Sequence, residues 1–336
     1  MPSSDNPSVG LVGLGNLGTA IANLVTTNCC EVIGWEFDAA VVEEINGQHT
    51  NTRFLPGIVL SPSLRATTDV RQVFDGTSIV FLAIPARFIR STVQPVVKAG
   101  LVRPNTVIVN MAKGIDVDTG LTAFQTTERL FPDNPCVMLS GPSIANEFAR
   151  GMPTVVMLAG SSNADLMRVS RVLDTRHFRT RFSRDTVGVE LGGLLKNIYA
   201  IGLGLFDGKG ITSLNFRAVY LTIALEEMTR IGVAMGAQAE TFAYLAGMGD
   251  LLATSLSGQS HNRHLGELLS QGSDLASIQQ EMGVLPEGYG TLRIALNIAE
   301  KLHVSLPLAK GLWDVINGRA DAEGFIFSFI RDFVED

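Results

Sequence analysis

Short runs of apolar, β-branched residues alternate with helix-like stretches over roughly the first half of the chain. These runs predict strands at Val9–Val12, Glu31–Trp35, Ser78–Ile84, Thr106–Met111, Cys136–Leu139 and Thr154–Leu158. Strands that are nearly continuous in apolar residues belong to parallel sheets with helices on both faces. Their alternation with helical stretches predicts βαβ units, and therefore an α/β Rossmann-type domain with a doubly wound, mostly parallel sheet.

A glycine-rich motif follows the first predicted strand and opens a helix-like stretch. It reads Gly-Leu-Gly-Asn-Leu-Gly over residues 13–18. In a dinucleotide-binding turn, Gly13 would permit the tight turn, Gly15 would let the backbone approach a pyrophosphate, and Gly18 would let helix and strand pack closely. Free N–H groups at the helix start attract phosphates. The alternative, a glycine-rich turn with no ligand, is less favoured because strand and helix both stand in the required places.

An acidic residue, Glu36, ends the next predicted strand, where it could accept hydrogen bonds from the adenosine ribose. Phe37 follows it, and neither Arg nor Lys lies between Glu31 and Glu44. The 2′-phosphate of NADP would require a cation near this point. The sequence therefore favours NAD over NADP, although Glu36 could instead be an acid that only ends the strand at the surface.

The pattern changes after Phe182, where helical patterns rich in Leu, Ala, Gly and Met replace the β-branched runs. Helices are predicted at 188–206, 214–233, 237–248, 260–270, 274–281, 288–302, 306–315 and 321–334. We therefore divide the chain into a dinucleotide-binding domain, residues 1–184, and an all-α domain for substrate and dimerisation, residues 185–336. A cleft between two such domains is a usual place for a substrate.

Composition narrows the function classes. The 336 residues are 46% hydrophobic, which is enough for a large core. Thirty-three acids against 26 bases give a net charge of −7, which disfavours a nucleic-acid binder. We find no uncharged run of 18 apolar residues and no secretory signal, so we expect no membrane span. Three cysteines, of which Cys29 and Cys30 are adjacent, make no disulfide framework and fit a reducing cytoplasm.

Two lysines are candidates for chemistry. Lys196 interrupts an apolar, glycine-rich helix, and a buried lysine is costly unless it is paired or takes part in a reaction. Desolvation suits such a group to general acid–base catalysis; the alternative is a lysine that reaches water from the helix end. Lys113 follows a predicted strand, where open α/β sheets bind their ligands. On its own, a lysine there is more often a solvated loop residue.

Polar clusters interrupt the apolar pattern at two other places in the second half. Asp250 follows a pair of glycines, which suits either a turn or an acid paired with a buried lysine. The run Ser260-His261-Asn262-Arg263-His264 starts a predicted helix, where a basic first turn suits a phosphate as well as it suits a solvated surface. The remaining histidines lie apart without metal-ligand spacing, so we predict no metal site.

These residues together resemble the NAD(P)-dependent glycerol-3-phosphate dehydrogenases over nearly the whole chain. Besides the glycine motif and Trp35, the shared motifs are Asn51-Thr-Arg-Phe-Leu-Pro-Gly57, Ala112-Lys113-Gly114-Ile115, Leu139-Ser-Gly-Pro142-Ser-x-Ala145-x-Glu147, Gly188-Val-Glu-Leu-x-Gly-x-Leu-Lys196-Asn197, Glu227-Met, Leu245-Ala-Gly-x-Gly-Asp250-Leu and Ser260-x-Asn262-Arg263.

The resemblance implies reversible hydride transfer between NAD(P)H and dihydroxyacetone phosphate, a small phosphorylated metabolite, by a homodimer. It implies Lys196 as the proton donor, with Lys113 and Asp250 completing the catalytic set. The implied cofactor contacts, with those argued above, are Gly13, Gly15, Asn16, Leu17, Gly18, Glu36, Phe37, Lys113, Ala145, Asn197, His261 and Glu287. The implied substrate contacts are Lys113, Gly141, Ser143, Lys196, Asp250, Thr254, Ser260, His261, Asn262 and Arg263.

Two departures from the family pattern concern the phosphate. The family usually has Arg where this chain has His261, and an Arg-Gly pair where it has Ile223-Ala224. They leave open a second interpretation, a reductase of the same fold that acts on another small hydroxy or keto compound. A third, a nucleotide sensor without turnover, is disfavoured because a sensor does not need the set of Lys113, Lys196 and Asp250.

Overall fold

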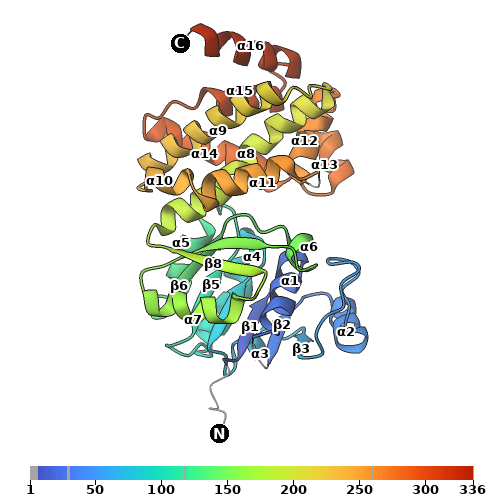
Figure 1. The fold of residues 1–336 in the computed structure, drawn as a ribbon, viewed down its shortest axis with the longest axis vertical. Coiled ribbons are helices and arrows are strands. Elements are labelled where there is room, and N and C mark those ends of the chain that lie inside the picture. Colours follow the sequence, from blue (N-terminus) through green and yellow to red (C-terminus); the bar gives the residue numbers. More distant parts are fainter. Residues whose placement is uncertain (1–6, 29–30, 117–118, 259, 336) are drawn as a thin grey trace. The chain divides into compact units, whose positions relative to one another are not determined.

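The chain forms two compact units, residues 1–190 and 191–336, shown as a ribbon in Figure 1. A computed structural model describes residues 7–28, 31–116, 119–258 and 260–335, so Cys29 and Cys30 lie outside the described residues. The division falls inside helix α8, Thr186–Gly208, whereas the sequence prediction placed the boundary just ahead of this helix, after residue 184.

The first unit is built on one eight-stranded sheet with the strand order β3-β2-β1-β4-β5-β6-β7-β8. The strands are β1 Val9–Val12, β2 Val32–Trp35, β3 Leu64–Thr67, β4 Ile79–Leu82, β5 Val107–Asn110, β6 Cys136–Ser140, β7 Thr154–Ala159 and β8 Phe178–Ser183. Neighbours run parallel except β6 and β7, which are antiparallel. The predicted fold class is therefore confirmed.

Two of the strands, β3 and β8, were missed by the sequence analysis. Both lie at the edges of the sheet, and both carry arginines among their apolar residues: Arg65 in β3, and Arg179 and Arg181 in β8. Edge strands need only one buried face, and charges on the other face discourage pairing with a further strand. The run of apolar residues that identified the central strands is therefore absent from them.

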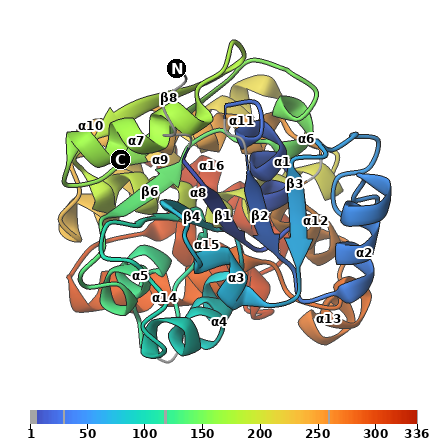
Figure 2. The ribbon, with the colours of Figure 1, turned by 90° about the horizontal axis from the view of Figure 1, so that it is seen from below.

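Helices cover both faces of this sheet, as Figure 2 shows. They are α1 Asn16–Val25, α2 Ala39–Gln48, α3 Val70–Phe74, α4 Ala86–Lys98, α5 Ala123–Leu130, α6 Ala145–Phe148 and α7 Asn163–Leu173. Successive residues of β1 point to opposite faces of the sheet and so into different cores. Leu11 belongs to the core beneath α1 and α7, while Val12 belongs to the core beneath α4 and α5.

The strand order reverses beside β1, and this positions the ligand-binding loops. The chain moves outward from β1 to β2 and β3, and then returns to place β4 on the other side of β1. Doubly wound sheets bind ligands at such a reversal, beyond the carboxyl ends of the strands. A ligand is therefore expected at the loops that follow β1, β4 and β5.

The second unit is helical throughout its described part. Besides most of α8, it contains α9 Leu214–Ala234, α10 Ala239–Phe242, the π-helical turn η1 Leu245–Gly249, α11 Asp250–Leu256, α12 His261–Ser270, α13 Leu275–Met282, α14 Glu287–Lys301, α15 Pro307–Ile316 and α16 Ala322–Glu335. The single helix predicted at 237–248 is wrong. It is divided into α10 and η1, because Gly247 lies against the backbone of Phe242, where no side chain would fit.

Helix α8 is the central helix of the second unit. By length and composition it could cross a membrane, but the whole of its apolar window is buried inside the structure, as in a core helix. Two glycines let it approach α12 closely: a Cβ at Gly204 would collide with the carbonyl of Arg263, and one at Gly266 with the carbonyl of Ile201. The helix that carries Lys196 is therefore held by backbone-to-backbone packing.

Replacing Gly204 by Ala should test this packing. The added methyl group must push α8 and α12 apart, and overpacking of this kind costs about 1–3 kcal/mol. The control is Gly290→Ala in α14, where no atom lies within 4 Å of the new Cβ and the change should stabilise the helix by up to about 1 kcal/mol. Urea unfolding measures both, and equal stability of the two variants would contradict the close approach.

Candidate functional site

The loop between β1 and α1 has the geometry of a phosphate-binding turn. Gly13 has a φ of 103°, a Cβ at Gly18 would collide with the carbonyl of Gly13, and nothing lies within 4 Å of a Cβ built at Gly15. Gly15 is also the N-cap of α1, and its lack of a side chain leaves the first turn without a side-chain cap. Gly13 thus makes the tight turn, Gly18 allows close packing of helix and strand, and Gly15 leaves the backbone open to a ligand, as the sequence predicted. A loop of this geometry fits a pyrophosphate.

Glu36 directly follows β2 and is buried, with an exposed fraction of 4%. Its carboxylate accepts hydrogen bonds from the backbone N–H of Leu14 (3.1 Å) and of Phe37 (3.0 Å). The sequence analysis assigned it to the ribose, and that contact stays a prediction. The structure adds another role, because the carboxylate joins the glycine loop to the end of β2. Phe37 beside it is exposed.

Asn51 holds the same loop from another side and was missed as a site residue. It is fully buried, and its Nδ2 donates to the carbonyl of Leu14 (2.9 Å) and to Oγ1 of Thr19 (2.8 Å). In the sequence it is only the first residue of a recognised motif. Its partners lie more than 30 positions away, so no local pattern indicates this role.

The loops after β4, β5 and β6 gather at the same edge of the sheet as the glycine loop. A Cβ at Gly13 would lie 2.6 Å from Cγ2 of Ile84, which follows β4. Nδ2 of Asn16 donates to Oδ1 of Asn146 in α6 (3.3 Å). This edge therefore holds the glycine loop together with the predicted residues Lys113 after β5 and Gly141, Ser143 and Ala145 after β6.

The second unit holds a buried ion pair between Lys196 of α8 and Asp250 of α11. Nζ of Lys196 donates to Oδ1 of Asp250 and also to Oγ1 of Thr254 (2.7 Å). The two charged side chains are only 10% and 3% exposed. Asp250 and Thr254 are four residues apart, so they share one face of α11. The pairing that the sequence suggested for Asp250 is thus present.

The π-helical turn η1 brings this acid to the lysine. The turn ends at Gly249, directly before Asp250 begins α11. Helix α8 approaches it closely, since a Cβ at Gly192 would lie 2.6 Å from the carbonyl oxygen of Ala246. Short π-helical segments often occur at functional sites. Here the segment places the carboxylate against a helix that is otherwise apolar.

Three helices converge beside the ion pair at Asn197 and Asn262. Oδ1 of Asn262 accepts a hydrogen bond from the N–H of Gly288, next to Glu287 at the start of α14 (2.9 Å). A Cβ at Gly288 would lie 2.5 Å from the carbonyl oxygen of Asn197. Several predicted residues are therefore gathered within the second unit.

Helix α12 begins with Ser260 as its N-cap and the exposed His261 as its first residue. The Ser260 side chain accepts from the N–H of Arg263 (3.4 Å). The guanidinium of Arg263 donates to the carboxylate of Asp207 and to the carbonyl oxygens of Ser255 (2.9 Å) and Ser257 (2.8 Å). These bonds hold the loop between α11 and α12, which favours a structural role, while its contact with substrate stays a prediction.

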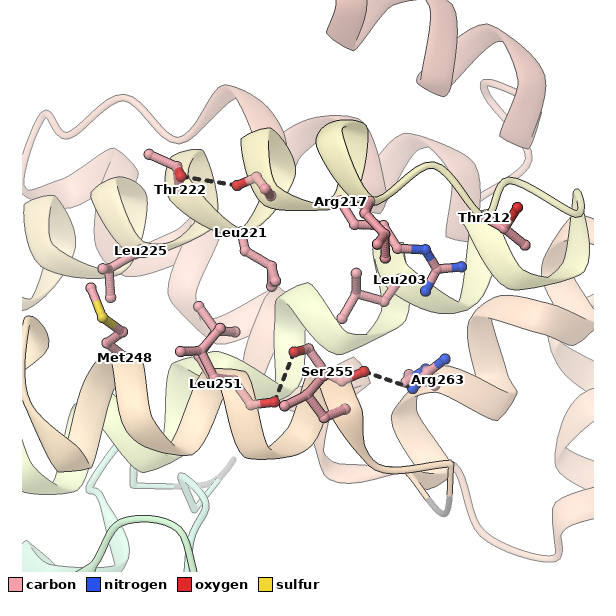
Figure 3. Close-up of a pocket in the computed structure, with 14 residues that line it drawn as sticks. Leu203, Thr212, Arg217, Leu221, Thr222, Leu225, Met248, Leu251, Ser255 and Arg263 are labelled. Carbon is pink, nitrogen blue, oxygen red and sulfur yellow. Dashed lines mark hydrogen bonds between the residues drawn. The ribbon is translucent and has the colours of Figure 1, made fainter.

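A cavity of about 730 Å³ opens between α9 and α11, and Figure 3 shows Leu221, Leu225 and Leu251 on its walls. Of the predicted site residues, Arg263 alone is among the described residues that line it. Helix α11 thus presents Asp250 to the lysine and Leu251 to this cavity. Among the described residues, no group of three or more His, Cys, Asp or Glu could hold a metal ion.

Comparisons with known proteins assign both halves of the chain to one enzyme family. The family model for the NAD-dependent glycerol-3-phosphate dehydrogenase N-terminus matches residues 8–166, and that for the C-terminus matches residues 185–326. A glycerol-3-phosphate dehydrogenase (NAD(P)+) of Geobacter sulfurreducens is 39% identical over 92% of each chain, and one of Sphingopyxis alaskensis is 35% identical over 98% of this chain and 97% of its own. The crystal structure of glycerol-3-phosphate dehydrogenase from Coxiella burnetii superposes with a TM-score of 0.88 at 28% identity, covering 97% of this chain and 99% of that one.

Proposed function

The chain belongs to the NAD-dependent glycerol-3-phosphate dehydrogenase family, and on that premise we propose that it interconverts dihydroxyacetone phosphate and glycerol 3-phosphate. The bound nicotinamide cofactor supplies or accepts the hydride. The observation that carries the proposal is the buried ion pair of Lys196 and Asp250, with Thr254 as the second hydrogen-bond partner of the lysine.

Lys196 is the proton donor in this proposal. Reduction of a ketone develops negative charge on its oxygen, and a positioned ammonium both neutralises that charge and delivers a proton. Asp250 stabilises the ammonium charge inside an apolar helix, and Thr254 fixes its direction by a second hydrogen bond. Lys113 would contribute the second positive charge at the reacting oxygen.

The cofactor would be held at the carboxyl edge of the sheet. Backbone N–H groups at the start of α1 would bind its pyrophosphate, and Glu36 lies at the end of β2, where an acid disfavours a 2′-phosphate. We therefore propose NAD as the preferred cofactor. An isolated nucleotide sensor would need this half of the site but would not need the buried lysine.

We also propose a homodimer that works in the cytoplasm. The support for a dimer is apolar surface on the second unit, where Leu214 and Leu256 are 81% and 85% exposed beside the cavity. Large leucines left in water favour association with another surface.

Lys196→Met should lower kcat for dihydroxyacetone phosphate by about 10² to 10⁴, the usual contribution of general acid catalysis. Methionine keeps the helix apolar and removes only the proton donor. Fluorescence titration should show nearly unchanged NADH binding, because the contacts proposed for the pyrophosphate and the adenosine ribose lie in the first unit. The control is Lys209→Met at an exposed position. A kcat within a few-fold of wild type would make Lys196 structural.

Glu36→Gln should narrow the preference for NADH over NADPH. We expect wild type to favour NADH in kcat/KM by about 1–3 kcal/mol, the scale of one unpaired charge contact. Glutamine keeps an acceptor for the N–H of Leu14 and removes the charge that repels a 2′-phosphate. Glu31→Gln, at the exposed position directly before β2, should leave the ratio of the two kcat/KM values unchanged. A wild-type preference for NADPH would overturn the proposal.

His261→Arg should lower KM for dihydroxyacetone phosphate by roughly tenfold, since a hydrogen bond to a charged group contributes about 1.5–3 kcal/mol. Arginine can bind phosphate through two parallel N–H groups, which imidazole cannot do. Dihydroxyacetone, which lacks the phosphate, should show no such gain, and neither should His264→Arg in the same exposed turn. Equal turnover of dihydroxyacetone and its phosphate would move the function to another small keto compound.

A further inference from the structure

A buried carboxylate, Glu190, stands outside the set of residues assigned to the reaction. It is the last residue of the first unit, and its exposed fraction is 3%. One carboxylate oxygen accepts from Oγ1 of Thr122 (2.6 Å), and the other accepts from the backbone N–H of Phe124 (2.8 Å). Burial raises the pKa of Glu190 to about 7. Burying a glutamate this deeply costs free energy. The two hydrogen bonds, which an apolar residue could not make, offset part of that cost.

Both hydrogen-bond donors belong to the start of α5. Thr122 is the N-cap of this helix and forms a capping box with Gln125, and Phe124 lies in its first turn. A carboxylate at this end interacts favourably with the helix dipole and with N–H groups that have no partner inside the helix. Glu190 therefore acts as a second cap, supplied by α8 from outside the helix.

The first turn of α5 also makes backbone contacts with the segment that carries Lys113. Ala123 donates its N–H to the carbonyl oxygen of Gly114 (3.0 Å), and Ile115 pairs with Thr122 in an isolated β-bridge. Gly114 has a φ of 144°, a backbone conformation that favours glycine. Lys113 is thus separated from the Glu190 cap by a short series of backbone contacts rather than by a free loop.

We propose that Glu190 is a positioning residue, which holds Lys113 in its reactive place through Thr122 and the first turn of α5. The proposal rests on the proposed role of Lys113 in the reduction. The helix that supplies the carboxylate, α8, also carries Lys196 six residues later. Glu190 itself contacts neither substrate nor cofactor in this proposal.

Glu190→Leu tests the tether, because leucine fills the buried space and makes neither bond. We expect kcat/KM for dihydroxyacetone phosphate to fall by about 10- to 100-fold, the usual effect of removing a supporting residue. Glu190→Gln should lose less, since its amide can still accept from Phe124 and donate to Thr122. NADH affinity should stay within about twofold in both variants. The control is Arg129→Gln at an exposed position of α5, which should leave kcat/KM at the wild-type value.

The decisive measurement repeats Glu190→Leu in a Lys113→Ala background. A residue that acts through Lys113 loses its effect once that side chain is gone. In the Lys113→Ala background, Glu190→Leu should therefore lower kcat/KM by less than about twofold. An equal loss in both backgrounds would overturn the proposal, because it would mean that Glu190 only supports the fold. Thr122→Val, which removes the hydroxyl that donates to Glu190, supplies the same comparison if the leucine variant does not fold.

Amide hydrogen exchange provides a readout that does not depend on turnover. In Glu190→Leu the amides of Ala123 and Phe124 should exchange about tenfold faster, because the bonds that close the turn are lost. Unchanged exchange there would overturn the tether even if activity fell. If the wild-type protein did not turn over dihydroxyacetone phosphate, the proposed function would be contradicted. Faster exchange in Glu190→Leu would then still support the contact between Glu190 and the first turn of α5.

Discussion

A lysine ammonium inside an apolar helix can exist only with an opposite charge against it, and much of the second unit follows from this requirement. An unpaired charge there would cost several kcal/mol. Asp250 must therefore begin its helix at the level of Lys196, directly after the π-helical turn that ends at Gly249. Gly192 makes room for that turn on α8. Glycines that look like weak points of a helix are thus the means by which two buried charges meet.

The first unit meets a different requirement, because a turn that binds phosphates through its backbone has no side chains of its own to hold it. Buried polar groups from distant segments supply that support. Glu36 binds the N–H of Leu14, while Asn51 binds its carbonyl, so both polar groups of one loop residue are held. These bonds hold the loop at Leu14, and the N–H groups in the first turn of α1 have no side-chain cap. This is preorganisation achieved by neutral and charged hydrogen bonds rather than by apolar packing.

The sequence was sufficient wherever a property is local. Apolar runs identified the central strands, and glycine spacing identified the turn after β1, because both are set by neighbouring residues. Lys196 was recognisable since a charge among apolar residues is costly in any fold. Edge strands such as β3 were missed because water on one side relaxes the apolar pattern, and the division of the helix at 237–248 depends on Gly247 lying against Phe242. Asn51 and Glu190 could not be assigned at all, as their partners come from remote parts of the chain.

The two departures expected from the family pattern concern the phosphate end of the substrate, and the structure describes the residues around one of them, His261. Arg263 stands two positions from the missing arginine, yet its guanidinium already serves Asp207 and the carbonyls of the loop before α12. Turning it toward a ligand would break those bonds and leave the partly buried carbonyl oxygens of Ser255 and Ser257 without this donor. The exposed His261 and the N–H groups of the first turn of α12 are better suited to an anion, because they can bind it without dismantling the loop. In the proposed function, the substrate phosphate would then be recognised more by the start of α12 than by a side-chain cation.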